Sequence, residues 1–306
     1  MPVEISIIIP LYNKEKYIIE TLTSVVNQTF VDWECLIIDD SSTDGSLDVV
    51  NAYLLTTKKL FKVISQKNSG QSVARNTGIF HSTGKYIAFL DADDIWATNK
   101  LAQQFSQLEA SLSSVCSLTA YQIYDPMKRN KFYKLVKHTE GKRLIDEWTN
   151  LLGFGGGIES GGLVRKSALN LVGGFREDLS TSAGLEMTVR LNSLGRILFS
   201  NGTYFRYRKY EGQWHTFENI LTGNLQVLRD LIGGSKTRLA KQHEAYILFS
   251  RLRTMGLGKF LNNNFLDALK IAPYILHLGI LILKRNLIAS ILGFVKAKKI
   301  SKLFFD

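Results

Sequence analysis

The stretch ISIIIPLYNKEKYIIETLTSVVNQ (Ile5–Gln28) decides the fold class. Its first eight residues, up to Tyr12, are mostly β-branched or apolar, which predicts a buried strand. Further on, apolar residues recur at the spacing of one helix face: Tyr17, Ile18, Leu22, Val25 and Val26. A buried strand followed by an amphipathic helix is the repeating unit of a parallel α/β sheet.

The same alternation continues for about a hundred residues. Three further strands are predicted by WECLIIDD (33–40), FKVISQ (61–66) and KYIAFLDAD (85–93). Helices are predicted by STDGSLDVVNAYLL (42–55), SGQSVARNTGIFHS (69–82), NKLAQQFSQLEASL (99–112) and EMTVRLNSLG (186–195). We expect Ser42 or Thr43 to cap the first of these helices. This order predicts a doubly wound, mostly parallel sheet with helices on both faces.

The composition narrows the class of protein. The chain has 306 residues, 45% of them hydrophobic, and a formal net charge of +11. This apolar content indicates a folded chain, and no nucleic-acid-binding motif accompanies the charge, so nucleic acid is not an expected partner.

Cys35 and Cys116 are the only cysteines, which argues against a disulfide framework or a zinc site. No signal peptide is visible, so we expect a cytoplasmic protein.

Polar clusters follow each of the four predicted strands: PLYN, DDSS, QKNSG and DADD. Ligands of doubly wound sheets bind outside the carboxyl ends of the strands. A core strand needs no such residues at its end. The sequence therefore predicts a binding site at this edge of the sheet.

Three aspartates end the fourth strand, Asp91, Asp93 and Asp94. If the backbone stays extended, Asp91 and Asp93 point to the same side, where unpaired carboxylates repel. Mn²⁺ or Mg²⁺ would remove that repulsion, and these ions bind a few carboxylates together with substrate phosphates. Asp94 is expected to help turn the chain. The alternative is a plain acidic loop before a helix.

Other strand-end residues suit a nucleotide. Tyr12 can stack on a base, and Asn13 can bond its polar edges. Asp39 or Asp40 can accept a hydrogen bond from a ring N–H such as N3 of uracil, and Arg75 can reach phosphate oxygens. The alternatives are a turn or capping role for the aspartates and a surface ion pair for Arg75.

Four segments carry a resemblance that covers about residues 3–195. They are SIIIPLYNKEKYIIETLTSVVNQTFVDWECLIIDDSSTDGS (6–46), NSGQSVARNTGI (68–79), GKYIAFLDADD (84–94) and LVRKSALNLVGGFRED (163–178). Together they resemble the inverting family 2 glycosyltransferases of the GT-A fold. The resemblance implies a GT-A-like α/β domain that uses Mn²⁺ or Mg²⁺ and moves a sugar from a nucleotide sugar, most often a UDP-sugar, to an acceptor hydroxyl.

The resemblance also assigns residues. It implies a donor site that includes Pro10, Tyr12, Asn13, Asp40, Arg75, Asp91 and Ala92. In that site Asp40 binds uracil, and Arg75 lies near base and diphosphate. Asp91 and Asp93 match the family's DxD metal pair, with Asp93 as the direct ligand.

The expected position of the catalytic base is where this sequence departs from the family's pattern. The family's usual Glu-Asp pair would fall on Ala183 and Gly184, which cannot take a proton. We assign Glu186 as the base after a shift of register. Two alternatives stay open: Glu159, Glu177 or Asp178 supplies the carboxylate, or the chain binds donor but turns over weakly or with a partner.

The remainder of the chain is less defined. We expect residues 1–205 to form the GT-A domain, with a nucleotide-binding half (1–110) and an acceptor-side half (111–205), and residues 206–306 to form a helical extension. Trp214 and His215 are candidates for the acceptor side. The apolar tail has a longest charge-free run of 271–283, short of the roughly 20 residues that span a bilayer. Its basic helices predict peripheral contact with the inner membrane face, packing on the domain, or a homo-oligomer interface.

The predicted function is metal-dependent inverting transfer of a sugar to a glycan or lipid-linked acceptor, as in cell-surface polysaccharide synthesis. One alternative is a donor-binding homologue with weak activity. A nucleotidyltransferase is less favoured, because PLYNKEKY has no glycine to cradle a triphosphate.

Overall fold

The computed structural model describes residues 3–127, 132–136, 158–210, 226–227 and 230. The chain divides into two compact units, residues 1–224 and 225–306. The predicted extension at 206–306, with Trp214, His215 and the basic tail, lies almost wholly outside the described residues, so its boundary and role stay predictions. In the described ranges, no helix has the length and apolar character needed to cross a membrane.

Strands and helices alternate from β1 to β4 (residues 5–89), as the sequence predicts. The first part contains β1 (Ile5–Leu11), α1 (Ile18–Val26), β2 (Trp33–Asp39), α2 (Ser46–Leu54), β3 (Phe61–Ser65), α3 (Gln71–His81), β4 (Tyr86–Phe89), β5 (Ile95–Trp96) and α4 (Lys100–Glu109). The second part contains β6 (Ser114–Tyr124), β7 (Phe132–Val136), α6 (Ile158–Gly161), β8 (Leu163–Arg165), α7 (Lys166–Val172), α8 (Ala183–Asn192) and β9 (Arg196–Arg208).

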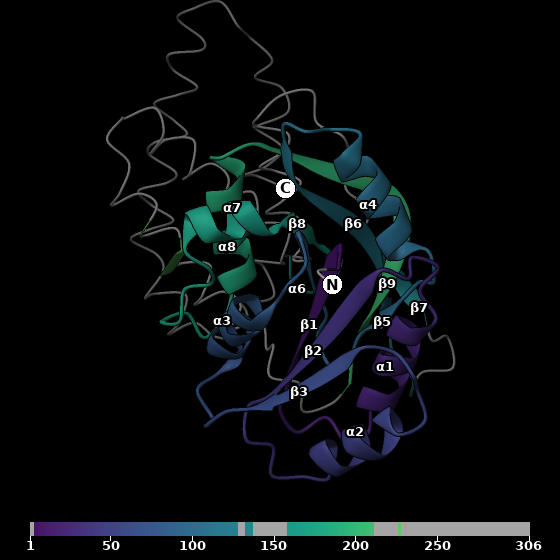
Figure 1. The fold of residues 1–306 in the computed structure, drawn as a ribbon. Coiled ribbons are helices and arrows are strands. Elements are labelled where there is room, and N and C mark those ends of the chain that lie inside the picture. The colour runs from purple at the N-terminus through teal and green to yellow at the C-terminus, as the bar shows by residue number, and fades with distance from the viewer. Residues whose placement is uncertain (1–2, 128–131, 137–157, 211–225, 228–229, 231–306) are drawn as a thin grey trace, which may run out of the picture. The chain divides into compact units, whose positions relative to one another are not determined.

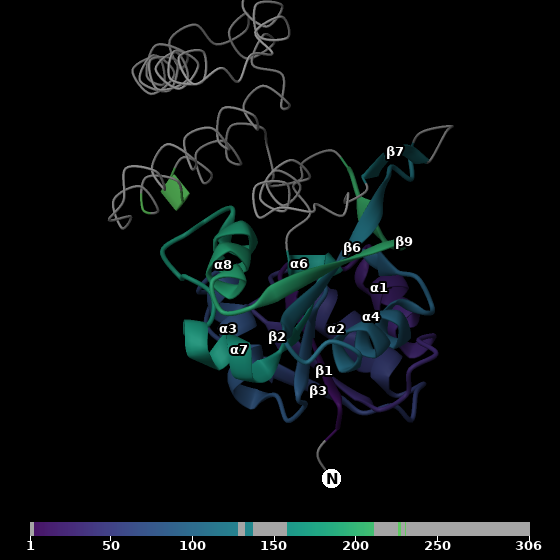
Figure 2. The ribbon, with the colours of Figure 1, turned by 90° about the horizontal axis from the view of Figure 1, so that it is seen from above.

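The described strands form one mixed sheet in the order β3-β2-β1-β4-β8-β6-β9-β5, with β7 paired to β6. The first four strands are parallel, which is the doubly wound half. β8 runs antiparallel to β4 and β6, whereas β6 and β9 run parallel and lie side by side (Figure 2). Helices α1, α2 and α4 lie on one side of the sheet and α3, α7 and α8 on the other (Figure 1). The predicted α/β fold with helices on both faces is confirmed.

Successive side chains of β1 point to opposite faces of the sheet. Ile5, Ile7 and Ile9 are fully buried in the main apolar cluster together with residues of α1 and α4. On the other face, Ile8 meets α3 at Gly78, where an added Cβ would lie 2.4 Å from Ile8 Cγ2. Only a glycine allows α3 to approach the sheet this closely.

Both cysteines lie within strands. Cys35 and Cys116 are free thiols, and each is fully buried. Burial raises the pKa of the Cys35 thiol well above its usual range.

Two local predictions are wrong. Helix α2 begins after Gly45, so Ser42 and Thr43 do not cap it. Instead Asp44, immediately before Gly45, accepts the N–H of Ser46 at 3.0 Å. The strand that leads to the aspartates also ends earlier than expected, at Phe89.

Candidate active site

A cavity of about 540 Å³ lies at the carboxyl ends of the parallel strands. Its walls come from the segments that follow β1, β2, β3 and β4, together with α6 and the segment that leads into α8. Among the predicted site residues, it is lined by Pro10, Tyr12, Asp40, Arg75, Asp91, Ala92 and Asp93. The four strand-end clusters therefore meet at one place, and the volume is in the range of small-molecule sites.

The three aspartates after β4 sit on a turn. The N–H of Asp94 donates to the carbonyl of Asp91 at 3.0 Å, so the backbone is not extended here. The expected alternation of side chains is therefore wrong, although Asp91 and Asp93 both line the cavity. The turn brings both carboxylates to the same space by a different geometry.

Asp91 is held from two elements. Arg75 of α3 donates from Nη2 to Asp91 Oδ1 at 2.7 Å, and Gln71 donates from Nε2 to the same oxygen at 3.1 Å. The N–H of Asp91 donates to Ser160 Oγ of α6 at 3.1 Å. Arg75 is only 2% exposed. It is therefore a buried counter-ion for Asp91 and not the surface ion pair considered above.

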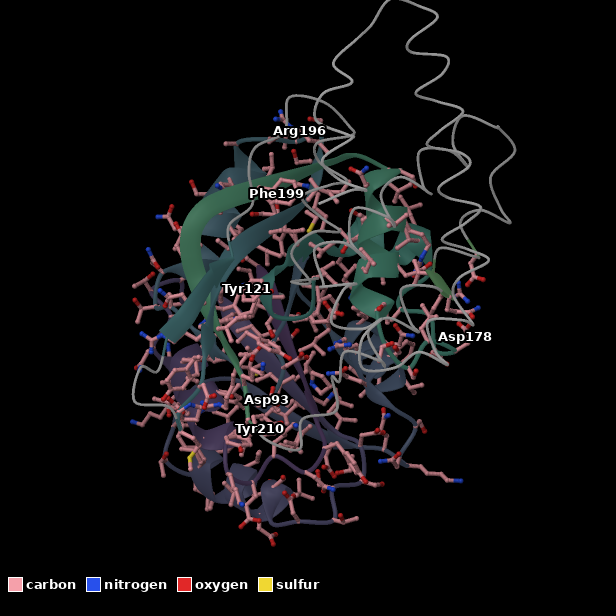
Figure 3. The ribbon with its side chains drawn as sticks, turned by 180° about the vertical axis from the view of Figure 1, so that it is seen from behind. Asp93, Tyr121, Asp178, Arg196, Phe199 and Tyr210 are labelled. Carbon is pink, nitrogen blue, oxygen red and sulfur yellow. The ribbon has the colours of Figure 1, made fainter. Side chains whose placement is uncertain are left out.

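Asp93 is held by Lys14 and Tyr210, and Figure 3 shows Asp93 and Tyr210 close together. The Lys14 ammonium lies 3.1 Å from Asp93 Oδ2, and the Tyr210 hydroxyl donates to that oxygen at 2.7 Å. Burial opposes the charge on Lys14, but Asp93 and Tyr210 outweigh it and raise the pKa of the ammonium. Burial and the charge of Asp93 raise the pKa of the Tyr210 hydroxyl. Lys14 is therefore charged and Tyr210 protonated around neutral pH.

Asp94 points away from solvent and fixes the end of β9. Its Oδ1 accepts the N–H of Arg208 at 3.0 Å, and its carbonyl accepts the Thr21 hydroxyl at 2.8 Å. Burial, reinforced by the charges of Asp93 and Asp91, raises the pKa of Asp94 well above its usual range. Its role is to hold the turn, in line with the expectation from sequence.

The DxD carboxylates suit a hard divalent cation. Asp91 Oδ2 and Asp93 Oδ1 have no hydrogen-bond donor among the described residues, and both residues line a cavity with room for a diphosphate. Two carboxylates plus phosphate oxygens and water are what Mn²⁺ and Mg²⁺ accept. Within the part of the chain that the structure describes, no three or more His, Cys, Asp or Glu side chains are grouped so that they could hold a metal ion by themselves. The residues thus fit a metal shared with substrate rather than a closed protein site.

Asp40 organises the part of the cavity wall that comes from the loop before α3. Its Oδ1 accepts the N–H of Ser69 and the Gln66 side-chain amide, each at 2.8 Å, and its Oδ2 accepts the N–H of Gly70 at 2.8 Å. Asp40 is 4% exposed, and it faces the cavity. It therefore shapes the loop before α3, and Oδ2 keeps a lone pair for a further donor.

Tyr12 and Asn13 have different positions. Tyr12 is 45% exposed and lines the cavity, as base stacking requires. Asn13 is not among the cavity-lining residues; its Oδ1 accepts the N–H of Thr43 at 2.8 Å. With a φ of 53°, Asn13 adopts the left-handed conformation that asparagine tolerates. Its observed contacts order the loop after β2.

The acidic candidates for the base are spread over three elements. Glu186 of α8 does not line the cavity, and its carboxylate forms an ion pair with Arg190 Nη2 at 2.6 Å. Glu159, Glu177 and Asp178 do line the cavity. Asp178 is paired with Arg176, and Glu177 accepts the Asn76 amide at 2.9 Å.

Sequence reasoning missed several residues of the cavity and its support, four of which carry polar side chains that matter here. Lys14, Gln71 and Tyr207 line the cavity, and Tyr210 holds Asp93. Lys14, directly after PLYN, could have been predicted, because a cation beside a strand-end binding site is suited to bind a diphosphate. Tyr207 and Tyr210 could not have been predicted from the sequence. They follow Asp93 by more than a hundred residues, and only the path of β9 brings them near it.

Comparison with known proteins defines the class. Residues 6–170 match the family described as Glycosyl transferase family 2. This is more than half of the chain. The chain is therefore a member of glycosyl transferase family 2.

Two named relatives each match a little over a third of the chain. A putative teichuronic acid biosynthesis glycosyltransferase, TuaG of Bacillus subtilis, is 40% identical over 121 residues, which are 39% of this chain and 47% of that protein. WfgD of Escherichia coli, a UDP-Glc:alpha-D-GlcNAc-diphosphoundecaprenol beta-1,3-glucosyltransferase, is 40% identical over 34% of this chain and 40% of its own length. The matches therefore span less than half of each of these relatives.

Solved structures confirm the fold. TarS 1-349 of S. aureus in complex with UDP-GlcNAc superposes with a TM-score of 0.67 at 21% identity, over 87% of this chain and 77% of that one. The mannosyltransferase PcManGT of Pyrobaculum calidifontis, in complex with GDP-Man and Mn2+, gives a TM-score of 0.62 at 17% identity, over 97% and 88%.

Proposed function

We propose that the chain catalyses metal-dependent, inverting transfer of a sugar from a UDP-sugar to a hydroxyl of a glycan or lipid-linked acceptor. The observation that carries the proposal is the meeting of Asp40, Arg75, Asp91 and Asp93 around one cavity at the carboxyl ends of the parallel strands. A base-recognition side, a cationic side and a carboxylate pair are what a nucleotide diphosphate sugar requires.

The nucleoside lies between Tyr12 and Asp40 in this proposal. Tyr12 stacks on the base, and the remaining lone pair of Asp40 Oδ2 accepts a ring N–H, which favours uracil. Lys14 and the amino-terminal end of α3 face the same cavity and attract the diphosphate. A relative that uses UDP-Glc and a fold neighbour solved with UDP-GlcNAc support this donor class.

The diphosphate is held against the DxD pair. Asp91 and Asp93 would hold Mn²⁺ or Mg²⁺, which supplies positive charge for the departing diphosphate when it is bound. Arg75 keeps Asp91 in place from the side of α3. The Mn2+ complex of the fold neighbour PcManGT supports this assignment.

The acceptor class rests on the relatives. TuaG and WfgD are named for teichuronic acid biosynthesis and for transfer to a diphosphoundecaprenol-linked sugar, respectively. A glycan or lipid-linked acceptor at the cytoplasmic face of a membrane fits this chain. Attachment through the basic tail and assembly as a homo-oligomer remain predictions.

Calorimetry and donor turnover test the proposal. UDP should bind in the presence of Mn²⁺ and lose most of its affinity in Asp93→Asn, and UDP should be released from UDP-glucose or UDP-N-acetylglucosamine. GDP serves as the matched competitor. Absence of Mn²⁺-dependent UDP binding would refute the proposal, and binding without release from any donor would favour a donor-binding homologue.

A further inference from the structure

The carboxylate of Glu159 occupies an unusual place beside α8. Its Oε1 accepts the N–H of Gly184 at 2.9 Å. A Cβ added to Gly184 would lie 2.0 Å from both Cδ and Oε1 of Glu159. The Glu159 carboxylate therefore fills the space that a side chain on residue 184 would otherwise use.

We propose that Glu159 is the catalytic base of the transfer reaction, so that the acid comes from α6 instead of from the first turn of α8. This inference rests on the proposed function and deepens it. Ala183 and Gly184 supply no acid, but Gly184 supplies room and a hydrogen bond for one.

The neighbours of Glu159 connect it to the donor site. Ser160 accepts the N–H of Asp91 at 3.1 Å, so α6 touches the turn that carries the aspartates. Glu159 lines the same cavity as Asp91, Asp93 and Ala183. A carboxylate on α6 thus faces the space where the sugar of the donor would lie.

The first turn of α8 orients the carboxylate of Glu159. The Gly184 N–H donates to it, and Gly184 lies in the first turn of α8, the positive end of a ten-residue helix. Within the described residues, Glu159 has no ion-pair partner. The Gly184 N–H orients the carboxylate, and no cation among the described residues pairs with it. An oxygen of Glu159 is therefore able to accept a proton.

The other acids are less suited to the role. Glu186 is 6% exposed, lies outside the cavity and is held by two donors of Arg190, at 2.8 and 2.6 Å. Asp178 forms an ion pair with Arg176, which lowers the pKa of its carboxyl and weakens it as a base. Glu177 is exposed and bonded to Asn76. Of the four candidates, Glu159 is the one that combines a place on the cavity wall with partial burial, a backbone hydrogen bond and no ion-pair partner among the described residues.

The step balances as a single displacement. The acceptor hydroxyl oxygen forms a bond to the anomeric carbon while its proton passes to a Glu159 carboxylate oxygen. The bond from the anomeric carbon to the diphosphate oxygen breaks, and its electron pair leaves with UDP. Glu159 then returns the proton to water.

The first test is Glu159→Gln, measured by Mn²⁺-dependent UDP binding and by UDP release from UDP-glucose and UDP-N-acetylglucosamine. We expect release to fall about 100-fold or more, as for loss of a general base, with the dissociation constant of UDP changed less than about threefold. Glu4→Gln is a matched control, because Glu4 pairs with Lys85 before β1 begins, at the end away from the cavity.

The second test moves the carboxylate from residue 159 to residue 184. Glu159→Ala combined with Gly184→Asp places a carboxylate on residue 184 in the vacated space. We expect the double variant to release UDP at least about tenfold faster than Glu159→Ala alone, a difference of roughly 1.4 kcal/mol in activation free energy. Gly184→Asp alone should lose activity, because the two carboxylates compete for one position.

The outcomes separate the two proposals. Wild-type release of UDP combined with unchanged release by Glu159→Gln would overturn the role of Glu159 and leave the proposed function intact. Failure of the wild type to bind UDP with Mn²⁺, or to release it from either donor, would overturn the function and this inference together.

Discussion

The Lys14 ammonium lies 3.1 Å from Asp93 Oδ2 and 2.7 Å from the hydroxyl of Tyr210, which itself donates to that carboxylate. A lysine therefore neutralises the carboxylate that is proposed to bind the metal. Any divalent cation that reaches Asp93 has to compete with this ammonium, because both are attracted to one negative charge.

Lys14→Met should tighten Mn²⁺ binding in the absence of nucleotide. The gain should be on the order of tenfold, since a charge pair at a partly buried site contributes about 1 kcal/mol or more. Titration followed by the electron paramagnetic resonance of free Mn²⁺ measures it. Lys85→Met, which removes the exposed partner of Glu4, is the control. Equal or weaker Mn²⁺ binding by Lys14→Met would contradict the competition.

Asp40→Asn should destabilise the protein and weaken UDP binding. The carboxylate accepts N–H groups from Ser69 and Gly70 and the Gln66 amide, and an amide nitrogen cannot accept any of them. Loss of a buried charge-assisted hydrogen bond costs about 2 kcal/mol. Urea unfolding measures that loss, with the exposed Asp48→Asn as control. An unfolding free energy equal to the wild type would show that the loop does not depend on this carboxylate.

Glu186→Gln should affect stability more than turnover. Glu186 orients Arg190, which donates to the carbonyl of Gly174 at 2.8 Å and so links α8 to the end of α7. We expect a loss of about 1 kcal/mol in unfolding free energy and UDP release within about threefold of the wild type. A double-mutant cycle with Arg190→Met isolates the pair. A large fall in turnover at unchanged stability would return the catalytic role to Glu186.

Lys100 should make the stability depend on pH. Burial lowers the pKa of its ammonium from 10.5 to about 7. Between these values the unfolded chain binds more protons than the folded one, so the unfolding free energy rises with pH, by an amount on the order of 3 kcal/mol. The Trp96 ring, 4.1 Å from Nζ, favours the charged form and reduces the effect.

Urea unfolding at pH 7, 8, 9 and 10 measures this dependence, and Lys100→Met should remove most of the rise. The slope is compared rather than the absolute stability, because the substitution also leaves the Gln104 side-chain oxygen without its donor. A slope that persists unchanged in Lys100→Met would show that another group titrates.

The sequence predicted the fold well because hydrophobic periodicity is a local property. Alternation from Ile5 onward predicted strands, helices and their order, and a parallel sheet follows from that order. Helix and strand ends were less predictable. Asn13, far in the sequence from the loop before α2, orders that loop by accepting the N–H of Thr43, and Asp44 rather than Ser42 or Thr43 accepts the N–H of Ser46.

The residues of the candidate site also differ in whether the sequence could predict them. Strand-end residues such as Asp40 and Asp91 were predictable because parallel strands bring their carboxyl ends to one edge. The Glu159–Gly184 contact was not, since it joins residues from two elements that sequence reasoning could not place side by side. The signal that existed was a glycine where an acid was expected, together with a glutamate flanked by glycines in GGGIESGG.

The shared space at Gly184 also constrains how such a site changes over generations. A side chain on residue 184 and the carboxylate of Glu159 exclude one another, because an added Cβ would lie 2.0 Å from that carboxylate. Single substitutions therefore pass through either a crowded intermediate or one with no acid at this point.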